Sequence, residues 1–245
     1  RGALRAWLTF GGNELLGVIA DTQLREVKTR LGSSLPELDM RELGGRFSWK
    51  RSGDGMEVAT SKLAFVTGDG LVLPAVDFLL RLGAGGESGY TRGELQANAL
   101  ELAPLVQLAD RLPLDAELRK SLTAFAPTGS LYDLSLRWNG AWPKPAAYSL
   151  RGRFHELSLR RHGSFPGFSG FSGNIDGTEK GGTLHVATQK AALEMPQLFR
   201  DRLQLDTLSG QLAWSQVAGG TELRFSNFAY ANADLAGMFG IYRTA

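Results

Sequence analysis

The sequence contains no cysteine and only three histidines, His155, His162 and His185. The missing cysteine excludes disulfides, thiolate metal sites and cysteine nucleophiles. No histidine has an acidic or histidine partner at metal-ligand spacing, so surface histidines are the better interpretation. Charge of one sign is also lacking, because 27 Lys and Arg face 25 Asp and Glu. That balance gives weak support for nucleic acid, and we expect no nucleic-acid partner.

The chain also lacks a hydrophobic run long enough to span a bilayer. The longest apolar run, residues 71–80, is interrupted by Pro74 and Asp77. The sequence starts at Arg1 without a Met, and no signal region follows. We therefore expect a piece of a longer polypeptide, with any membrane anchor outside it. Its 245 residues, with 43% hydrophobic and 21% charged, exclude a disordered chain and favour one elongated unit.

Motifs of catalysis are missing. The Gly-Ser-Phe segment 167–173 is not a nucleophile elbow, because Gly170 follows Ser169 directly. We interpret this segment as a turn that leads into a strand, with its two phenylalanines packed. The glycine-dense segment 83–89 lacks a phosphate-loop Lys and precedes a strand pattern, which favours a hairpin loop. The carboxylates form no acid–base pair, so we predict that the protein is not an enzyme and carries no metal or cofactor.

Alternation of apolar and polar residues dominates what is present. Phe47 and Trp49 alternate with polar residues before the turn-forming segment 52–55. Residues 132–138 and 148–154 show the same period of two. About a dozen such strands with short connections favour an antiparallel meander over βαβ units.

One segment, residues 102–125, has a helical period instead. Its leucines recur at helical spacing, and Asp115 is placed to cap a second helix that ends before Pro127. The sequence therefore predicts a helical insert of two short helices near the middle of a mainly β chain.

A candidate internal repeat links two distant segments. A shift of 165 residues aligns residues 38–69 with residues 203–234 without a gap. Nine positions are identical: Leu38/Leu203, Leu43/Leu208, Gly45/Gly210, Trp49/Trp214, Gly55/Gly220, Glu57/Glu222, Ser61/Ser226, Ala64/Ala229 and Asp69/Asp234. A repeat of one β unit is one interpretation. Chance alignment of two amphipathic hairpins is the other.

Two architectures would bury the apolar sides of so many strands. A β-sandwich or closed barrel would bury its two halves against each other. A sheet curled into a trough would leave an apolar interior for a ligand, with the helices at one end. For the trough we predict that residues on the apolar phase of the strands line the interior: Phe47, Trp49, Leu136, Trp138, Phe154, Leu212, Trp214 and Phe225.

Several segments together carry a family resemblance. They are LPLD at 112–115, LTAFAPTG at 122–129, Trp138, YSLRGRF at 148–154, PGFSGFSG at 166–173, GQLAW at 210–214, and residues 233–234. In order and spacing they resemble the YhdP branch of the AsmA-like proteins, from about residue 38 to the end. The resemblance implies a mainly β fold, a long antiparallel meander curled into a groove or taco-like half-barrel.

The same resemblance implies a function. Members are similar to bridge-like lipid transporters of the Gram-negative envelope, anchored in the inner membrane. It implies that this chain is a periplasmic segment that moves phospholipid between inner and outer membrane, with acyl chains as the ligand. The alternatives are a closed-core scaffold or interaction module, or a carbohydrate- or protein-binding sandwich that uses exposed aromatics such as Trp7, Trp142 and Tyr90. The lipid, its direction of movement and the oligomeric state stay open.

Overall fold

A computed structural model describes residues 1–53, 55–84, 90–112, 114–141, 144–163, 165–196, 201–233 and 236–244. It contains fourteen strands and two helices. In chain order these are β1 (Gly2–Gly11), β2 (Glu14–Thr29), β3 (Leu38–Ser52), β4 (Gly55–Thr67), β5 (Val72–Val76), β6 (Phe78–Ala84), β7 (Tyr90–Glu101), α1 (Leu102–Leu108), α2 (Ala116–Phe125), β8 (Thr128–Asn139), β9 (Ala147–Leu159), β10 (Gly167–Thr178), β11 (Gly181–Glu194), β12 (Leu203–Val217), β13 (Gly220–Ala231) and β14 (Ala236–Thr244). The mainly β prediction is confirmed, with slightly more strands than expected.

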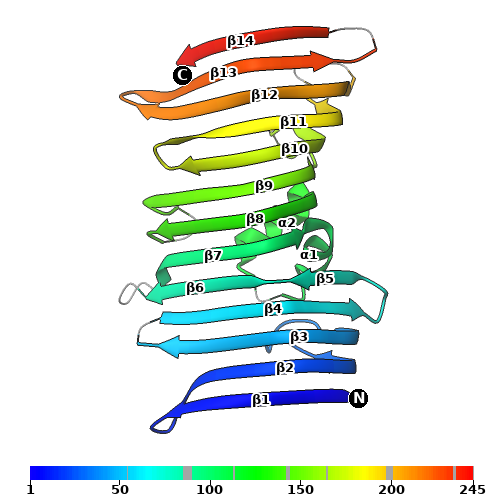
Figure 1. The fold of residues 1–245 in the computed structure, drawn as a ribbon, viewed down its shortest axis with the longest axis vertical. Coiled ribbons are helices and arrows are strands. Elements are labelled where there is room, and N and C mark those ends of the chain that lie inside the picture. The colour runs from blue at the N-terminus through cyan, green and yellow to red at the C-terminus, as the bar shows by residue number, and fades with distance from the viewer. Residues whose placement is uncertain are drawn as a thin grey trace.

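The strands form one antiparallel meander (Figure 1). Each strand pairs with the next along the chain, except that the short β5 pairs only with β4, so β4 also pairs with β6. β1 and β14 are the two edges, and the sheet is curled and groove-like without closing on itself. In the described residues, therefore, neither a two-sheet sandwich nor a closed barrel forms.

The hairpin turn predicted at 52–55 is present. β3 ends at Ser52 and β4 begins at Gly55, while Asp54 lies outside the described residues. Gly53 adopts a φ of 54°, which a glycine reaches without the steric cost that a Cβ imposes. Of the predicted loop at 83–89, Gly83 and Ala84 belong to the end of β6, and residues 85–89 lie outside the described part of the chain.

Paired irregularities bend the strands. In four places a glycine with positive φ lies opposite a non-glycine residue that also has positive φ. In each case the second residue is on the next strand of the meander. The pairs are Gly45 with Lys62, Gly129 with Glu156, Gly170 with Lys190 and Gly210 with Asn227. The pairing register breaks around these positions, as it does in β-bulges. Bulges bend a strand and increase its twist, and this accounts for the curl of the sheet.

The two predicted helices are confirmed within residues 102–125. The Asp115 carboxylate accepts a hydrogen bond from the backbone N–H of Glu117 at 2.9 Å, as an N-cap residue does. Ala126 ends α2 in the left-handed conformation, and Pro127 follows. Both helices lie behind the sheet in Figure 1.

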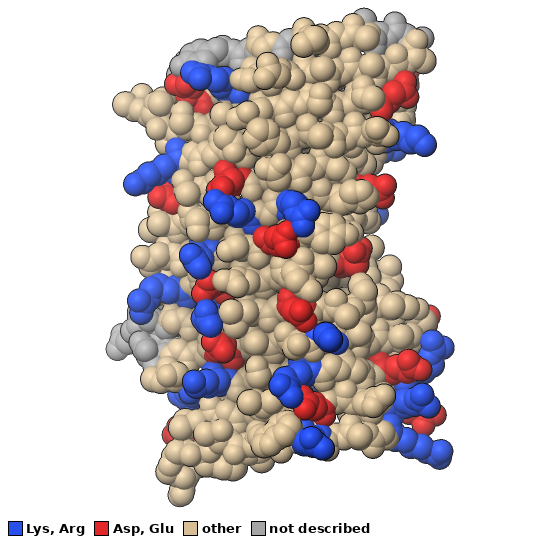
Figure 2. Space-filling view, in the orientation of Figure 1, with Lys and Arg blue, Asp and Glu red and all other residues tan. Residues whose placement is uncertain are grey.

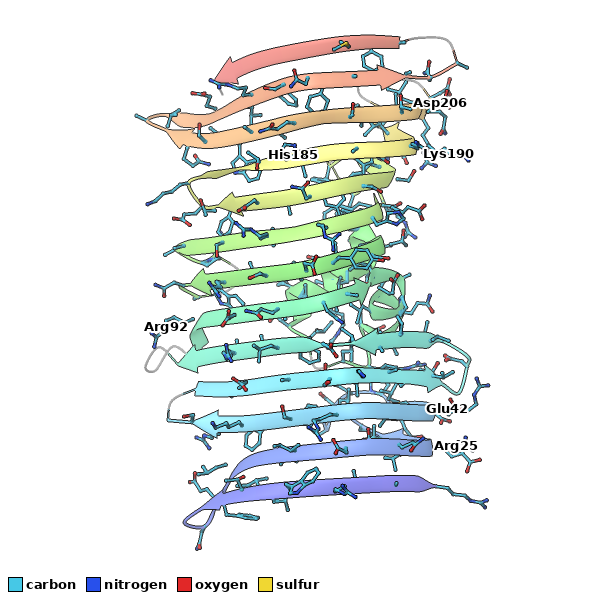
Figure 3. All side chains as sticks on the ribbon, viewed as in Figure 1. Arg25, Glu42, Arg92, His185, Lys190 and Asp206 are labelled. Carbon is cyan, nitrogen blue, oxygen red and sulfur yellow. The ribbon has the colours of Figure 1, made fainter. Side chains whose placement is uncertain are left out.

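Buried side chains gather toward one end of the strands. One cluster joins β3, β4 and β5 to α1: Leu38, Met40, Phe65, Leu73, Val76 and Leu108. A second cluster joins β11 and β12: Val186, Ala191, Leu205 and Leu208. We call this end the packed end. The other, which holds the turn between β3 and β4, is the open end. Figure 3 shows Arg25, Glu42, Lys190 and Asp206 toward the packed end and Arg92 at the open end.

The two segments of the candidate repeat fold as similar hairpins. β3 and β12 begin at equivalent positions, Leu38 and Leu203, and β4 and β13 begin at Gly55 and Gly220. The positive-φ positions are also equivalent, since Gly45 and Lys62 correspond to Gly210 and Asn227. Asp234, at the end of the aligned segment, lies outside the described residues. That the two are repeat units of one origin stays a prediction.

Candidate functional site

Register divides the sheet into two chemically different faces. Residues directly opposite one another in an antiparallel pair lie on the same face, so a face can be followed from strand to strand. One unbroken row crosses eleven strands of the meander, all except β5 and the two edges: Val18, Trp49, Val58, Leu80, Leu95, Leu136, Leu150, Gly177, Gly182, Trp214 and Leu223. Every member is apolar or glycine, and we call the face that carries this row the apolar face.

All eight residues predicted to line a trough lie on the apolar face. Trp49, Leu136 and Trp214 belong to the row itself. The other five occupy neighbouring positions of the same phase: Phe47, Trp138, Phe154, Leu212 and Phe225. Seven of the eight are half-buried, whereas Phe154 is only 8% exposed and belongs to the packed interior. The structure thus gathers the set on one surface, and its role in lining a path stays a prediction.

Sequence reasoning missed several members of this surface. Leu80 and Leu95 lie in the row between Val58 and Leu136, and Tyr148 pairs with Trp138. The same apolar–polar alternation marks these residues in the sequence. It is weaker there, because β6 is short and β7 carries many polar residues. Only the pairing register shows that they continue the apolar row.

The opposite face carries a ladder of cross-strand ion pairs. Figure 2 shows acidic and basic side chains interspersed over it. Each pair joins neighbouring strands: Arg46 with Asp21, Arg81 with Glu57 and Glu94, Arg137 with Glu94, Arg151 with Asp176, and Arg153 with Asp133. We call this the charged face. Such pairs keep it hydrated and give it no affinity for apolar ligands.

Electrostatics on the charged face favours the ionised state of its acids. A hydrogen bond from Arg137, with further bonds from Gln96 and Arg81, holds the pKa of Glu94 below its usual value, although partial burial acts in the opposite direction. A hydrogen bond from Arg46 likewise lowers the pKa of Asp21. These carboxylates are therefore ionised partners of the neighbouring arginines. A general acid needs a raised pKa, and theirs are lowered.

The apolar face is covered unevenly. α1 places Leu108, which is completely buried, on the packed end of β3 to β5. α2 has no buried residue, and its Phe125 contacts His162 and Phe165 edge to face. The tryptophans toward the open end, Trp49, Trp138 and Trp214, stay half-exposed.

The segment with the Gly-Ser-Phe pattern is not a turn. Residues 167–178 form the strand β10, with a bulge at Gly170, so the expected turn leading into a strand is corrected to the strand itself. Phe168 and Phe171 pack edge to face with ring centroids 4.9 Å apart, as expected. The serine hydroxyl of Ser172 accepts the backbone N–H of Glu156, which shows a structural use for this polar group.

The remaining candidates form no reactive cluster. Among the described residues, no group of three or more His, Asp or Glu side chains is placed to hold a metal ion. His155, His162 and His185 are exposed. The described part of the chain also has no helix with the length and hydropathy of a bilayer span.

Of the three exposed aromatics proposed for a sandwich-type binding site, Trp7 alone has a described side chain. Trp7 is 46% exposed on the charged face, with the Arg5 guanidinium 6.0 Å from its ring centroid. Trp142 lies outside the described residues, as does the side chain of Tyr90.

Comparison with known proteins gives one match. A family model described as "YhdP protein" matches residues 1–245. No curated protein and no solved structure matches the chain.

Proposed function

The chain belongs to the YhdP family, a family of lipid-transport-related envelope proteins that is not enzymatic, and from that premise we propose a specific role. The chain is a periplasmic segment of a bridge that carries phospholipid between the inner and outer membranes. Acyl tails lie on the apolar face, and the charged face stays in water. The rest of the parent protein supplies the contacts with the two membranes.

One observation supports this role above the others. The apolar row from Val18 to Leu223 crosses eleven strands without a charged residue, while ion pairs occupy the opposite face of the sheet. A closed scaffold would bury such a row. Here seven of the eight predicted lining residues remain partly accessible.

The energetics of lipid movement fit a continuous apolar surface. A two-tailed lipid in water exposes about 30 methylenes, each at a cost of ~0.8 kcal/mol. A row that runs across the strands replaces water along the whole path, so no single site has to hold the lipid. Loose contact also suits movement, because a deep and specific pocket would trap the cargo.

Site-specific photocrosslinking in the full-length parent protein tests the role. p-Benzoylphenylalanine would replace Leu136 or Leu212 on the apolar face, and the adjacent residues Arg137 or Gln211 on the charged face as matched controls. After irradiation in cells, mass spectrometry measures phospholipid attached to the protein. We expect attachment at Leu136 and Leu212 and background at the controls. Equal yields on both faces, or none at either, would contradict the proposal.

A charge placed on the apolar face gives a second test. Leu136→Asp should reduce lipid attachment at Leu212 several-fold, because an ionised carboxylate on the path repels acyl chains. The fold should persist, since Leu136 is half-exposed and the new charge stays hydrated. Protease resistance of the purified variant measures this. If the variant folds and lipid attachment is unchanged, the path does not pass Leu136.

A further inference from the structure

Large aromatic rings on the apolar face lie over glycines of the adjacent strand or, for Trp214 and Gly177, of the next strand but one. For each of these glycines, a methyl group added to the backbone would overlap an aromatic ring. The combinations are Trp138 over Gly93, Phe154 over Gly173, Trp214 over Gly177 and Gly182, Phe228 over Gly210, and Tyr230 over Gly237. The rings therefore lie close against the backbone, in space that only the missing side chain of glycine provides.

The two tryptophans show this most clearly. A methyl at Gly93 would overlap three atoms of the Trp138 indole, and these are its three nearest atoms. A methyl at Gly177 would lie 2.6 Å from Cζ2 and 3.1 Å from Cη2 of Trp214. In both cases the obstacle is the indole and not the backbone, so the ring has to move if the methyl is added.

The third tryptophan of the apolar face lacks this arrangement. Trp49 pairs with Val18 on one side and Val58 on the other. The glycines are thus a property of the Trp138 and Trp214 positions and not a general requirement of a tryptophan in this sheet.

We propose that Gly93 and Gly177 are positioning residues that set the depth of the apolar face where lipid tails pass. They let the indoles of Trp138 and Trp214 lie flat on the sheet. A methyl at either position lifts the indole into the volume that the tails occupy and obstructs their passage. The inference rests on the proposed function, because it concerns the same surface.

Three alanine substitutions in the full-length parent protein test the inference. Gly93→Ala and Gly177→Ala should each lower photocrosslinking of phospholipid at Leu136 and Leu212 several-fold. Gly152→Ala is the matched control, since Gly152 lies on the same face and its added methyl has its nearest neighbour, Leu134 Cδ1, at an ordinary 3.5 Å. That variant should crosslink as the unmodified protein does.

A double-mutant cycle separates obstruction by the ring from a general effect of the methyl. In the Trp138→Leu background, Gly93→Ala should cause no further change, because no indole remains to be lifted. The same holds for Gly177→Ala in the Trp214→Leu background. A loss of equal size with and without the indole would overturn the inference.

The outcomes distinguish the two proposals. No lipid attachment in the unmodified protein contradicts the proposed function itself. Normal attachment there, with unchanged attachment in both glycine variants, overturns only the positioning role. Protease resistance is measured in parallel, and loss of fold in both single variants would also overturn it, because the glycines would then serve folding rather than passage.

Discussion

The hairpins β3–β4 and β12–β13 bend at equivalent positions. In the first, Gly45 lies beside Lys62, and in the second, Gly210 and Asn227 take the same two places. Strand bounds and the tryptophan positions correspond as well. The surroundings differ. α1 and β5 cover the packed end of the first hairpin, whereas the cluster beside the second contains no helical residue.

The difference shows which features are local. The bend and the turn belong to each hairpin's own sequence, because they persist in both surroundings. The side chains that cover each hairpin differ. Leu108 and Val76 pack on the first hairpin. Phe171 packs on the second, together with Phe228 and Tyr230 of that hairpin. A hairpin of this kind can therefore be placed along the sheet without a fixed partner.

The largest expected effect comes from removing the cover of the first hairpin. Leu108→Asp puts an unpaired charge at a fully buried position and should cost about 3–5 kcal/mol. Hydrogen exchange should show lost protection in β3–β4 and retained protection in β12–β13. Leu118→Asp, on α2 at 39% exposure, is the control and should change little. Equal loss in both hairpins would mean that their stabilities are not separate.

Equivalent glycines should respond unequally. Gly45→Ala would bring a methyl to 2.6 Å from the backbone of Lys62 and Leu63, and should cost ~2–3 kcal/mol. Gly210→Ala meets the ring of Phe228, which can shift, and should cost ~1–2 kcal/mol. Denaturation midpoints measure both. Gly44→Ala, with its nearest atom at 4.0 Å, is the control. A larger loss of stability for Gly210→Ala than for Gly45→Ala would contradict this explanation, in which contact with the backbone is more costly than contact with a ring.

The strand between the hairpins allows a pH test of the charged face. The pKa of Glu94 is lowered in the folded state, so its ion pairs stabilise the fold above the unfolded pKa near 4.5, and that stability is lost as pH falls through the folded pKa. Glu94→Gln should cost about 1–2 kcal/mol at neutral pH and flatten the decline of stability below pH 4.5. Urea denaturation across pH measures it. An unchanged pH profile would exclude Glu94 as the titrating group, and the exposed Glu117→Gln serves as control.

The smallest effect concerns the left-handed residues of the two bulges. Lys62 and Asn227 have φ values of 51° and 53°, a conformation that asparagine tolerates better than lysine. Lys62→Asn should stabilise the fold by about 0.5 kcal/mol, and Asn227→Lys should destabilise it by a similar amount. Thermal midpoints of the two variants should move in opposite directions. Shifts of the same sign would show that contacts, not φ, decide these positions.

Much of the fold followed from periodicity. Alternation at Phe47–Trp49 and the turn at 52–55 predicted β3 and β4, and Asp115 predicted the start of α2. The apolar phase placed all eight predicted residues on one face, because the side-chain period of a strand is two. The bulges did not change the face of these residues. No bulge lies between two predicted lining residues of the same strand, such as Phe47 and Trp49.

Other features depended on lateral pairing, which periodicity does not contain. Phe154 looked like the other predicted residues, yet it is buried beside Gly173 while Leu136 stays accessible. The glycines beneath Trp138 and Trp214 lie on other strands, such as Gly93 in β7 beneath Trp138 in β8. Which strand supplies the neighbour is a matter of register, and one sequence gives no direct signal for it.

The meander order of the strands has a kinetic consequence. Almost every pairing joins strands that are consecutive in sequence, so each new strand needs only a short loop to close before it can add to its neighbour. The sheet can therefore assemble from one edge while the chain is still being delivered, without waiting for its far end. Mechanical extension from the ends should reverse this order and release hairpins in successive steps. A single rupture in an optical-trap record would instead show that the strands unfold together.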